Sequence, residues 1–154
     1  MPGENLTRHE AIERAETVSV QSYEIEIDLT AGSETFASNT RVRFNAKEGS
    51  STFIDAITHA VHSVVLNGEV LDPAKVSDGI RIQLPNLAAE NELVVVASGK
   101  YTNTGEGLHR FVDPVDGEVY LYTQFEVPDS RRMFAVFEQP DLKATFSFNI
   151  TAPA

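Results

Sequence analysis

The sequence contains no cysteine, so it can form neither a disulfide nor a thiolate metal site, as is typical of a cytoplasmic protein. Basic residues are also scarce: 12 Lys and Arg stand against 23 Asp and Glu, which gives a net charge of −11. Because such a chain repels polyanions, we expect no nucleic-acid partner. An acidic surface favours cationic ligands such as the free amino terminus of a peptide, although solubility alone also accounts for it.

Long apolar segments are missing as well. No run approaches the length that spans a membrane, and residues 1–5 (MPGEN) have neither the basic residues nor the apolar stretch of a secretory signal. We therefore expect a cytoplasmic protein without a membrane partner. The 154 residues suffice for one compact domain, and neither an internal repeat nor a low-complexity linker divides them.

Catalytic motifs are the third absence. His9-Glu10 begins like the zinc motif H-E-x-x-H, but Glu13 stands where the second histidine belongs. His59 and His62 have a spacing that suits two ligands on one helical turn, yet they lie in a β-branched segment without a third ligand nearby. A nucleophile elbow, a phosphate-binding glycine loop and a dinucleotide motif are absent. We therefore predict no catalytic and no metal-binding residue in this chain, which argues against a stand-alone hydrolase.

One helix is indicated near the start of the chain. Residues 7–10 (TRHE) match a capping box, in which a Thr hydroxyl and a Glu carboxylate satisfy the first free amides of a helix. They predict a short helix over residues 8–16. Its apolar stripe would consist of Ala11, Ile12 and Ala15.

Most of the remaining sequence has the period of two that is typical of strands. Residues 23–29 (YEIEIDL) place apolar side chains at every odd position and acidic ones at every even position. Residues 93–97 (LVVVA) are apolar throughout, which predicts a strand covered on both faces. Asn67-Gly68 lies between two apolar runs and predicts a tight hairpin. Further alternating segments are residues 40–44, 80–84 and 144–150.

These patterns predict a mainly β fold, an antiparallel β-sandwich or saddle-shaped sheet with a short N-terminal helix. The final residues follow a strand directly, so we expect the natural chain to continue beyond Ala154. Strand pattern and composition fit two functions equally well: a non-catalytic part of an enzyme, or an independent β-sandwich binding or adhesion module.

The most polar strand candidate comes late in the chain. On an extended strand one face would carry two phenols, an amide and a carboxylate, from Tyr120, Tyr122, Gln124 and Glu126. Such a face lines a polar pocket or is simply solvated. Residues 128–134 (PDSRRMF) then predict a short helical turn near 129–134, capped by Asp129. A turn at this place would hold Gln124 and Glu126 rigidly, as a ligand site requires.

Several blocks in this region resemble a known family. Residues 122–126 (YTQFE), 131–134 (RRMF) and 137–146 (FEQPDLKATF) resemble the end of the first domain in the aminopeptidase N family of zinc metallopeptidases, the gluzincin aminopeptidases. Residues 103–110 (NTGEGLHR) are similar to the loop that precedes these blocks in bacterial members. The chain departs from the family with Ala-Val at 135–136 where Pro-Cys is common, and with Glu-Gln at 138–139 where Asp-Glu is common. Upstream of residue 101 the resemblance is weaker.

The resemblance implies a role for the whole chain. In this family one zinc ion is bound by H-E-x-x-H and a downstream Glu on a second, thermolysin-like domain that also carries G-A-M-E-N, and this sequence has neither motif. Residues 1–154 would then be a single N-terminal β domain of a longer aminopeptidase, inactive alone. Gln124 would line the pocket for the first side chain of a peptide substrate, and Glu126 would bind its free α-amino group. The partners of this chain would be the peptide substrate and the catalytic domain of the same parent chain. An exposed apolar patch is expected on the surface that the catalytic domain would cover.

Overall fold

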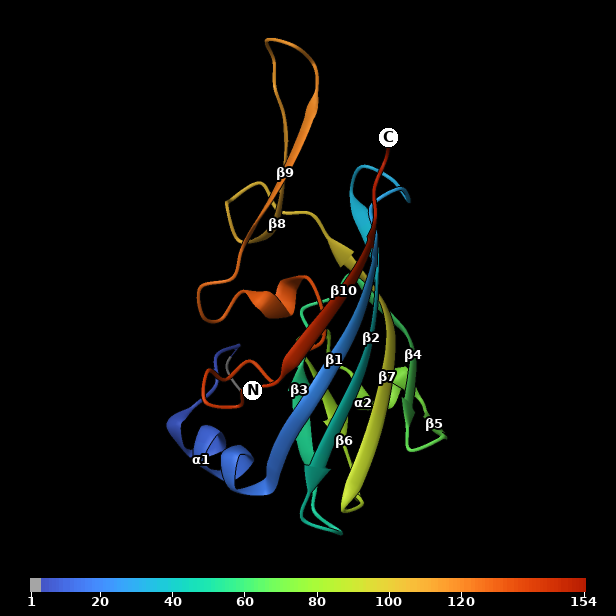
Figure 1. Ribbon diagram of the computed structural model, residues 1–154, viewed down its shortest axis with the longest axis vertical. Helices are drawn as coiled ribbons and strands as arrows, with labels where there is room; N and C mark the ends of the chain where they lie inside the picture. The colour runs from blue at the N-terminus through green and yellow to red at the C-terminus, as the bar shows by residue number, and fades with distance from the viewer. Residues whose placement is uncertain (1–3) are drawn as a thin grey trace.

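The computed structural model describes residues 4–154. Residues 1–3 lie outside this range. The prediction drawn from residues 1–5, that they do not form a secretory signal, therefore falls mostly outside the described residues. Two α-helices, ten strands and one 3₁₀ helix are present within the described range (Figure 1). Their bounds are α1 Arg8–Thr17, β1 Val18–Asp28, β2 Thr35–Ala46, β3 Thr52–Asp55, β4 Ala60–Leu66, β5 Glu69–Leu71, α2 Pro73–Val76, β6 Arg81–Leu84, β7 Glu90–Lys100, β8 Gly107–Val112, β9 Val119–Gln124, η1 Ser130–Arg132 and β10 Thr145–Thr151.

The N-terminal helix forms as predicted, but it packs in an unexpected way. The Glu10 amide donates to the Thr7 hydroxyl and the Thr7 amide donates to the Glu10 carboxylate, which confirms the capping box. The predicted apolar stripe is not the packing face, because Ile12 is about half exposed. The buried residue of α1 is Arg14. The helix is therefore attached to the body of the protein by a guanidinium group.

The largest element is a six-stranded sheet in the order β10-β1-β2-β7-β4-β5. The expectation of a mainly β fold is confirmed, and all neighbours in this sheet are antiparallel except β1 and β10, which run parallel. The sheet is therefore mixed. The predicted hairpin joins β4 and β5, where Asn67 and Gly68 have φ angles of 52° and 81°. Two successive positive φ values are what a type I′ turn requires.

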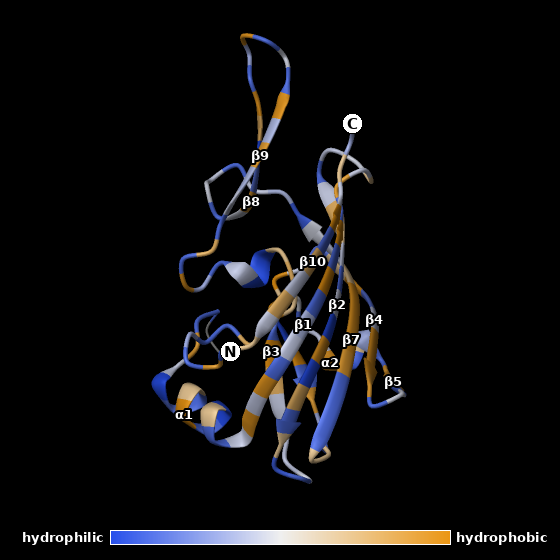
Figure 2. Ribbon diagram, viewed as in Figure 1, coloured by the Kyte–Doolittle hydropathy of each residue, from blue (hydrophilic) through white to orange (hydrophobic). Residues whose placement is uncertain are grey.

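The inner face of this sheet carries most of the core. Along β1 the buried positions change parity, from Val18 and Val20 to Tyr23, Ile25 and Ile27. An irregularity between Val20 and Ser22 accounts for this change, because a β-bulge inserts one residue and so redirects the following side chains. Apolar and polar colours alternate along β1 and β2 in Figure 2, as expected for strands with one wet face.

A second layer covers the inner face. It consists of the two-stranded β3–β6 sheet and the segment from η1 to residue 139, which has no strand of its own. The segment is fixed by individual hydrogen bonds: Ser38 Oγ donates to the Met133 carbonyl at 2.7 Å, and the Phe137 amide donates to Tyr23 Oη at 3.0 Å. Val136 also exchanges backbone hydrogen bonds with Asp55 of β3. These contacts satisfy backbone groups that would otherwise be buried without partners.

The outer face of the sheet remains wet. Glu24, Arg41, Arg43 and Glu92 form ion pairs across β1, β2 and β7, all about half exposed. The prediction that residues 93–97 are covered on both faces is wrong. Leu93, Val95 and Ala97 are buried, but the alternate side chains face outward and are only partly covered.

Two elements extend apolar side chains into solvent. The β8–β9 hairpin projects beyond the end of the main sheet, on the side where the chain terminates (Figure 1). Strand β10 is an edge strand, and its residues Phe146, Phe148 and Ile150 are opposite Tyr23, Ile25 and Ile27 of β1. They extend the row of core side chains, yet they are 45–49% exposed.

Candidate substrate-binding turn

The end of β9 and the turn after it contain the two residues predicted to bind substrate. Strand β9 ends at Gln124, so Glu126 does not lie on the strand as predicted but one residue beyond Phe125, in the turn that leads to η1. Tyr120 and Tyr122 occupy the same face of β9 as Gln124 and are about half exposed. Gln124 is partly buried, whereas Glu126 is exposed. The turn thus folds back so that the Gln124 side chain contacts the Glu126 backbone.

Hydrogen bonds fix the amide of Gln124 between two groups. Its Oε1 accepts from the Glu126 amide at 2.5 Å, and its Nε2 donates to Asp129 Oδ2 at 3.4 Å. The Asp129 amide in turn donates to the Glu126 carbonyl at 3.0 Å. Gln124, Glu126 and Asp129 therefore form a closed loop of contacts.

The Glu126 carboxylate and the Glu126 backbone differ in their hydrogen bonding. Within residues 4–154, all hydrogen bonds of Glu126 run through its main-chain amide and carbonyl. The carboxylate is therefore exposed and free to accept hydrogen bonds from an external cation, while its backbone is held.

The helical turn itself is confirmed, but its capping differs from the prediction. Asp129 precedes η1 and makes no side-chain cap hydrogen bond. Instead the Glu138 carboxylate accepts from the Arg131 amide at 2.8 Å and from the Ser130 hydroxyl. Asp129 is thereby left to accept from Arg132 Nε at 3.1 Å. The sequence offered no local signal for this exchange, because Glu138 lies beyond the turn that it caps.

The wall beside the turn is formed by the start of β8. Gly107 is opposite Gln124 and has a φ of 63°. A Cβ at this position would lie 2.6 Å from the Cβ of Arg132, so only glycine permits this approach. The rings of His109 and Tyr122 stack with their centroids 4.6 Å apart. The glycine-rich loop thus serves close packing against η1.

Comparison with known proteins identifies the family. The model of the peptidase M1 N-terminal domain matches residues 19–154. The chain belongs to the peptidase M1 family. Aminopeptidase N of Streptomyces lividans is 60% identical over 99% of this chain, and probable M1 family aminopeptidase 1 of Encephalitozoon cuniculi is 36% identical over 62% of it. The resemblance to the aminopeptidase N family is thereby confirmed, and it favours the enzyme part over the independent module.

This M1 N-terminal domain spans only a small part of these relatives, 18% of the Streptomyces protein and 13% of the Encephalitozoon protein. Solved structures show the same fold at low identity. Yeast LTA4 hydrolase in complex with bestatin superimposes with a TM-score of 0.73 at 17% identity, over 97% of this chain and 24% of that one. Legionella pneumophila aminopeptidase A in complex with aspartic acid gives a TM-score of 0.72 at 16% identity, over 87% and 16%.

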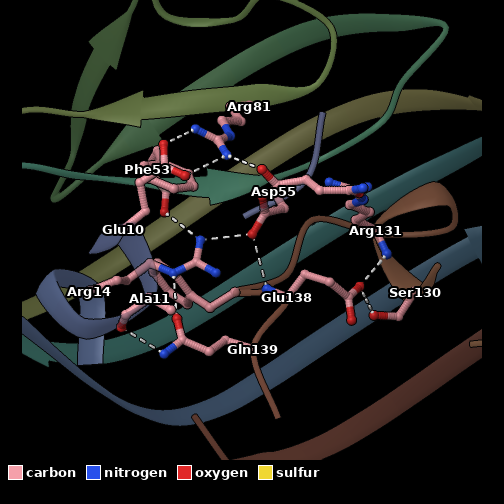
Figure 3. A network of polar contacts seen from close by, with 12 residues as sticks. Glu10, Ala11, Arg14, Phe53, Asp55, Arg81, Ser130, Arg131, Glu138 and Gln139 are labelled. Atoms are coloured by element: carbon pink, nitrogen blue, oxygen red, sulfur yellow. Dashed lines mark hydrogen bonds and ion pairs between the residues drawn. The ribbon is translucent and has the colours of Figure 1, made fainter. Parts of the chain in front are cut away.

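The M1 domain also contains a buried polar network that sequence reasoning missed (Figure 3). Arg14 Nη1 lies 2.7 Å from Asp55 Oδ2, and both side chains are only 1% exposed. Arg14 Nε donates to Gln139 Oε1 at 3.1 Å, and Gln139 Nε2 donates to the carbonyl of Ala11 at 2.9 Å. The Glu138 amide donates to Asp55 Oδ2 at 3.1 Å. The network joins α1, β3 and the segment after η1.

A second ion pair extends this network toward β6. Arg81 Nη1 lies 2.6 Å from Glu10 Oε1, and the hydrogen bond from Arg81 lowers the pKa of the Glu10 carboxyl to about 2. The guanidinium groups of Arg14 and Arg81 lie over the Phe53 ring at 4.7 and 4.2 Å. Burial raises the pKa of the Tyr23 hydroxyl. Glu10 is engaged by Arg81 and the Tyr23 hydroxyl by the Phe137 amide, so the arrangement of these perturbed groups is structural.

The remaining candidates for metal binding lie on the surface. His9 Nε2 is 3.7 Å from Glu13 Oε2 on the exposed face of α1, while His62 Nε2 is 2.7 Å from Ser98 Oγ. His59 is exposed just before β4. Within residues 4–154 no group of three or more His, Cys, Asp or Glu side chains is arranged to bind a metal ion. In the same range, no helix is long and apolar enough to cross a membrane.

Proposed function

We propose that this domain forms one wall of the substrate site of a zinc aminopeptidase, which removes amino-terminal residues from peptides. Glu126 binds the free α-amino group of the peptide, and Gln124 lines the pocket for its first side chain. The observation that carries the proposal is the state of Glu126, whose backbone is held by Gln124 and Asp129 while its carboxylate remains free. A carboxylate with a fixed backbone can select chains whose terminus is charged.

The domain supplies recognition and not the reaction. The residues between 4 and 154 do not fit a zinc site, so the proposed zinc ion and the general base belong to the part of the enzyme outside this chain. When bound there, zinc supplies Lewis-acid chemistry at the scissile carbonyl and its water. The 154 residues alone are accordingly proposed to be inactive. A cytoplasmic location remains part of this proposal, in keeping with the absence of cysteine.

A catalytic domain of the same parent chain is the proposed partner. Phe146, Phe148 and Ile150 continue the core row of β1 but are half exposed at the free edge of the sheet. Phe134 packs edge-on against both phenylalanine rings, and Phe146 also stacks on Tyr23. Contiguous apolar surface of this kind marks a protein interface. We propose that downstream parts of the enzyme cover this edge and the projecting β8–β9 hairpin.

The test uses the full-length enzyme and an aminoacyl substrate. Glu126→Gln keeps the shape of the side chain but removes its charge, so kcat/KM should fall about ten- to hundredfold, mainly through KM, as expected for a lost hydrogen bond to a charged group. Glu48→Gln, at an exposed carboxylate in the turn between β2 and β3, is the matched control and should leave KM unchanged. An unaltered KM in Glu126→Gln would remove Glu126 from the site.

A further inference from the structure

We infer that Asp129 and Arg132 are positioning residues, which orient Gln124 and Glu126 for binding of the substrate amino group. The inference rests on the proposed function, because it concerns the same site. It assigns a role to two charged side chains that are largely covered by the protein, unlike a residue that contacts the substrate directly. Asp129 is 13% exposed and Arg132 is 25% exposed.

The contacts form a continuous series from η1 to the backbone of Glu126. Arg132 Nε donates to Asp129 Oδ1 at 3.1 Å, and Asp129 Oδ2 accepts from Gln124 Nε2 at 3.4 Å. On the other side of the amide, Gln124 Oε1 accepts from the Glu126 backbone at 2.5 Å. Each oxygen of Asp129 thus has its own donor. Displacement of Arg132 or Asp129 would therefore change the orientation of Gln124.

The chemistry of each group determines which way the Gln124 amide points. An ionised carboxylate can only accept hydrogen bonds, and a backbone N–H can only donate. With Asp129 on one side and the Glu126 amide on the other, Gln124 must present its NH₂ to the first and its oxygen to the second. A neutral side chain at position 129 would remove this constraint. Asp129 therefore determines the orientation of the amide that holds the Glu126 backbone.

Arg132 is well suited to hold Asp129 because the rest of its guanidinium is also engaged. Its Nη2 lies 3.4 Å from Glu4 Oε1 and 3.7 Å from Glu106 Oε2. The planar guanidinium thus joins the turn, the N-terminal segment and the loop before β8 in one fixed geometry. It also offsets the charge of Asp129, so that Glu126 remains the carboxylate of the turn without a cationic partner in the described chain.

The neighbouring arginine provides a contrast. Arg131 is buried, and its guanidinium donates to the Glu4 carbonyl at 2.5 Å and to Asn5 Oδ1 at 3.2 Å. Arg131 therefore fastens the N-terminal segment and does not contact Asp129. If Arg132 only fastened the N-terminal segment through Glu4, replacing Arg132 would lower the stability of the protein and leave substrate binding unchanged. The two roles can be separated experimentally.

The experiment uses the full-length enzyme, with KM, kcat and thermal midpoint measured for each variant. Asp129→Asn puts an NH₂ donor where two donors, Arg132 Nε and Gln124 Nε2, converge, so one contact must break. We expect KM to rise about tenfold, the size of one charge-assisted hydrogen bond, with kcat nearly unchanged. Arg132→Met should raise KM in the same way, and Arg132→Lys should restore part of the loss.

Two comparisons make the outcome decisive. In a Gln124→Ala background, Asp129→Asn should not raise KM further, because the amide through which it acts is gone. Glu4→Gln, which keeps an oxygen acceptor for Arg132 Nη2 and leaves the Arg132–Asp129 pair intact, should keep the KM of the parent enzyme. A lower thermal midpoint with unchanged KM in Asp129→Asn and Arg132→Met would overturn the inference, as would additive effects of Asp129→Asn and Gln124→Ala.

Glu126→Gln, measured alongside, separates failure of the inference from failure of the proposed function. A raised KM in Glu126→Gln together with an unchanged KM in Asp129→Asn overturns the positioning role and leaves the proposed function standing. An unchanged KM in Glu126→Gln overturns the proposed function and the inference with it.

Discussion

The polar network around Arg14 and the turn around Gln124 are built from the same kinds of groups but differ in their exposure to water. In the network, Arg14, Asp55 and Gln139 face one another and are shielded from water. In the turn, a similar set of contacts holds the backbone of Glu126 and leaves its carboxylate outside. Buried charges must be paired because desolvation is costly, whereas an unpaired carboxylate at the surface costs little. The difference distinguishes a structural network from the turn that we propose as a recognition site.

The largest effect is expected from Arg14→Ala. It leaves the Asp55 carboxylate buried without its cation and should lower the free energy of unfolding by about 3–5 kcal/mol, measured by urea titration. Arg41→Ala is the control, since Arg41 is 47% exposed and its ion pairs should contribute no more than about 1 kcal/mol. Equal losses in the two variants would contradict the structural reading of the network.

A smaller effect concerns Glu10 and depends on pH. Its pKa is lower in the folded chain, about 2, than the ordinary 4.5, so the ionised group stabilises the fold above pH 4.5 and this contribution disappears as the pH falls toward 2. Because the side chain is 24% exposed, we expect Glu10→Gln to cost about 1–2 kcal/mol at pH 7 and to flatten the acid dependence of urea unfolding. A variant that loses stability between pH 4.5 and 2 as steeply as the parent would exclude this role.

The smallest effect tests how the segment after η1 is attached. Ser38→Ala removes the hydrogen bond to the Met133 carbonyl, and about 1 kcal/mol should be lost in thermal or urea unfolding. Thr40 lies on the same face of β2, but its buried hydroxyl has no hydrogen-bond partner within residues 4–154. Thr40→Val should therefore be neutral or stabilising. A larger loss of stability in Thr40→Val than in Ser38→Ala would contradict the conclusion that Ser38, and not Thr40, attaches this segment.

Local patterns predicted the elements whose cause is local. The capping box at Thr7 and Glu10, the Asn67-Gly68 turn and the alternation of β1 all depend on residues close in sequence. The attachment of α1 through Arg14 was not predictable, because its partners Asp55 and Gln139 come from distant segments. The parallel pairing of β10 was missed for the same reason.

The candidate site was foreseen only in part. Alternation placed Gln124 and Glu126 on one face, and their proposed roles came from the family resemblance. The turn over residues 129–134 was expected to hold them, but its contacts were not foreseen: Asp129 was expected to cap η1, and Arg132 had no contact of its own assigned. The missing information was Glu138, which caps η1 from beyond it and so releases Asp129.

The parallel pairing of β1 and β10 has a consequence for the way the chain reaches its final form. Ser22 is opposite Thr145, so nearly every other element must be synthesised before this pair of strands can meet. Contacts between residues so far apart in sequence carry a large loop-closure cost and form slowly. We expect β10 to gain its hydrogen-exchange protection last during refolding, after the antiparallel strands β1, β2, β7 and β4.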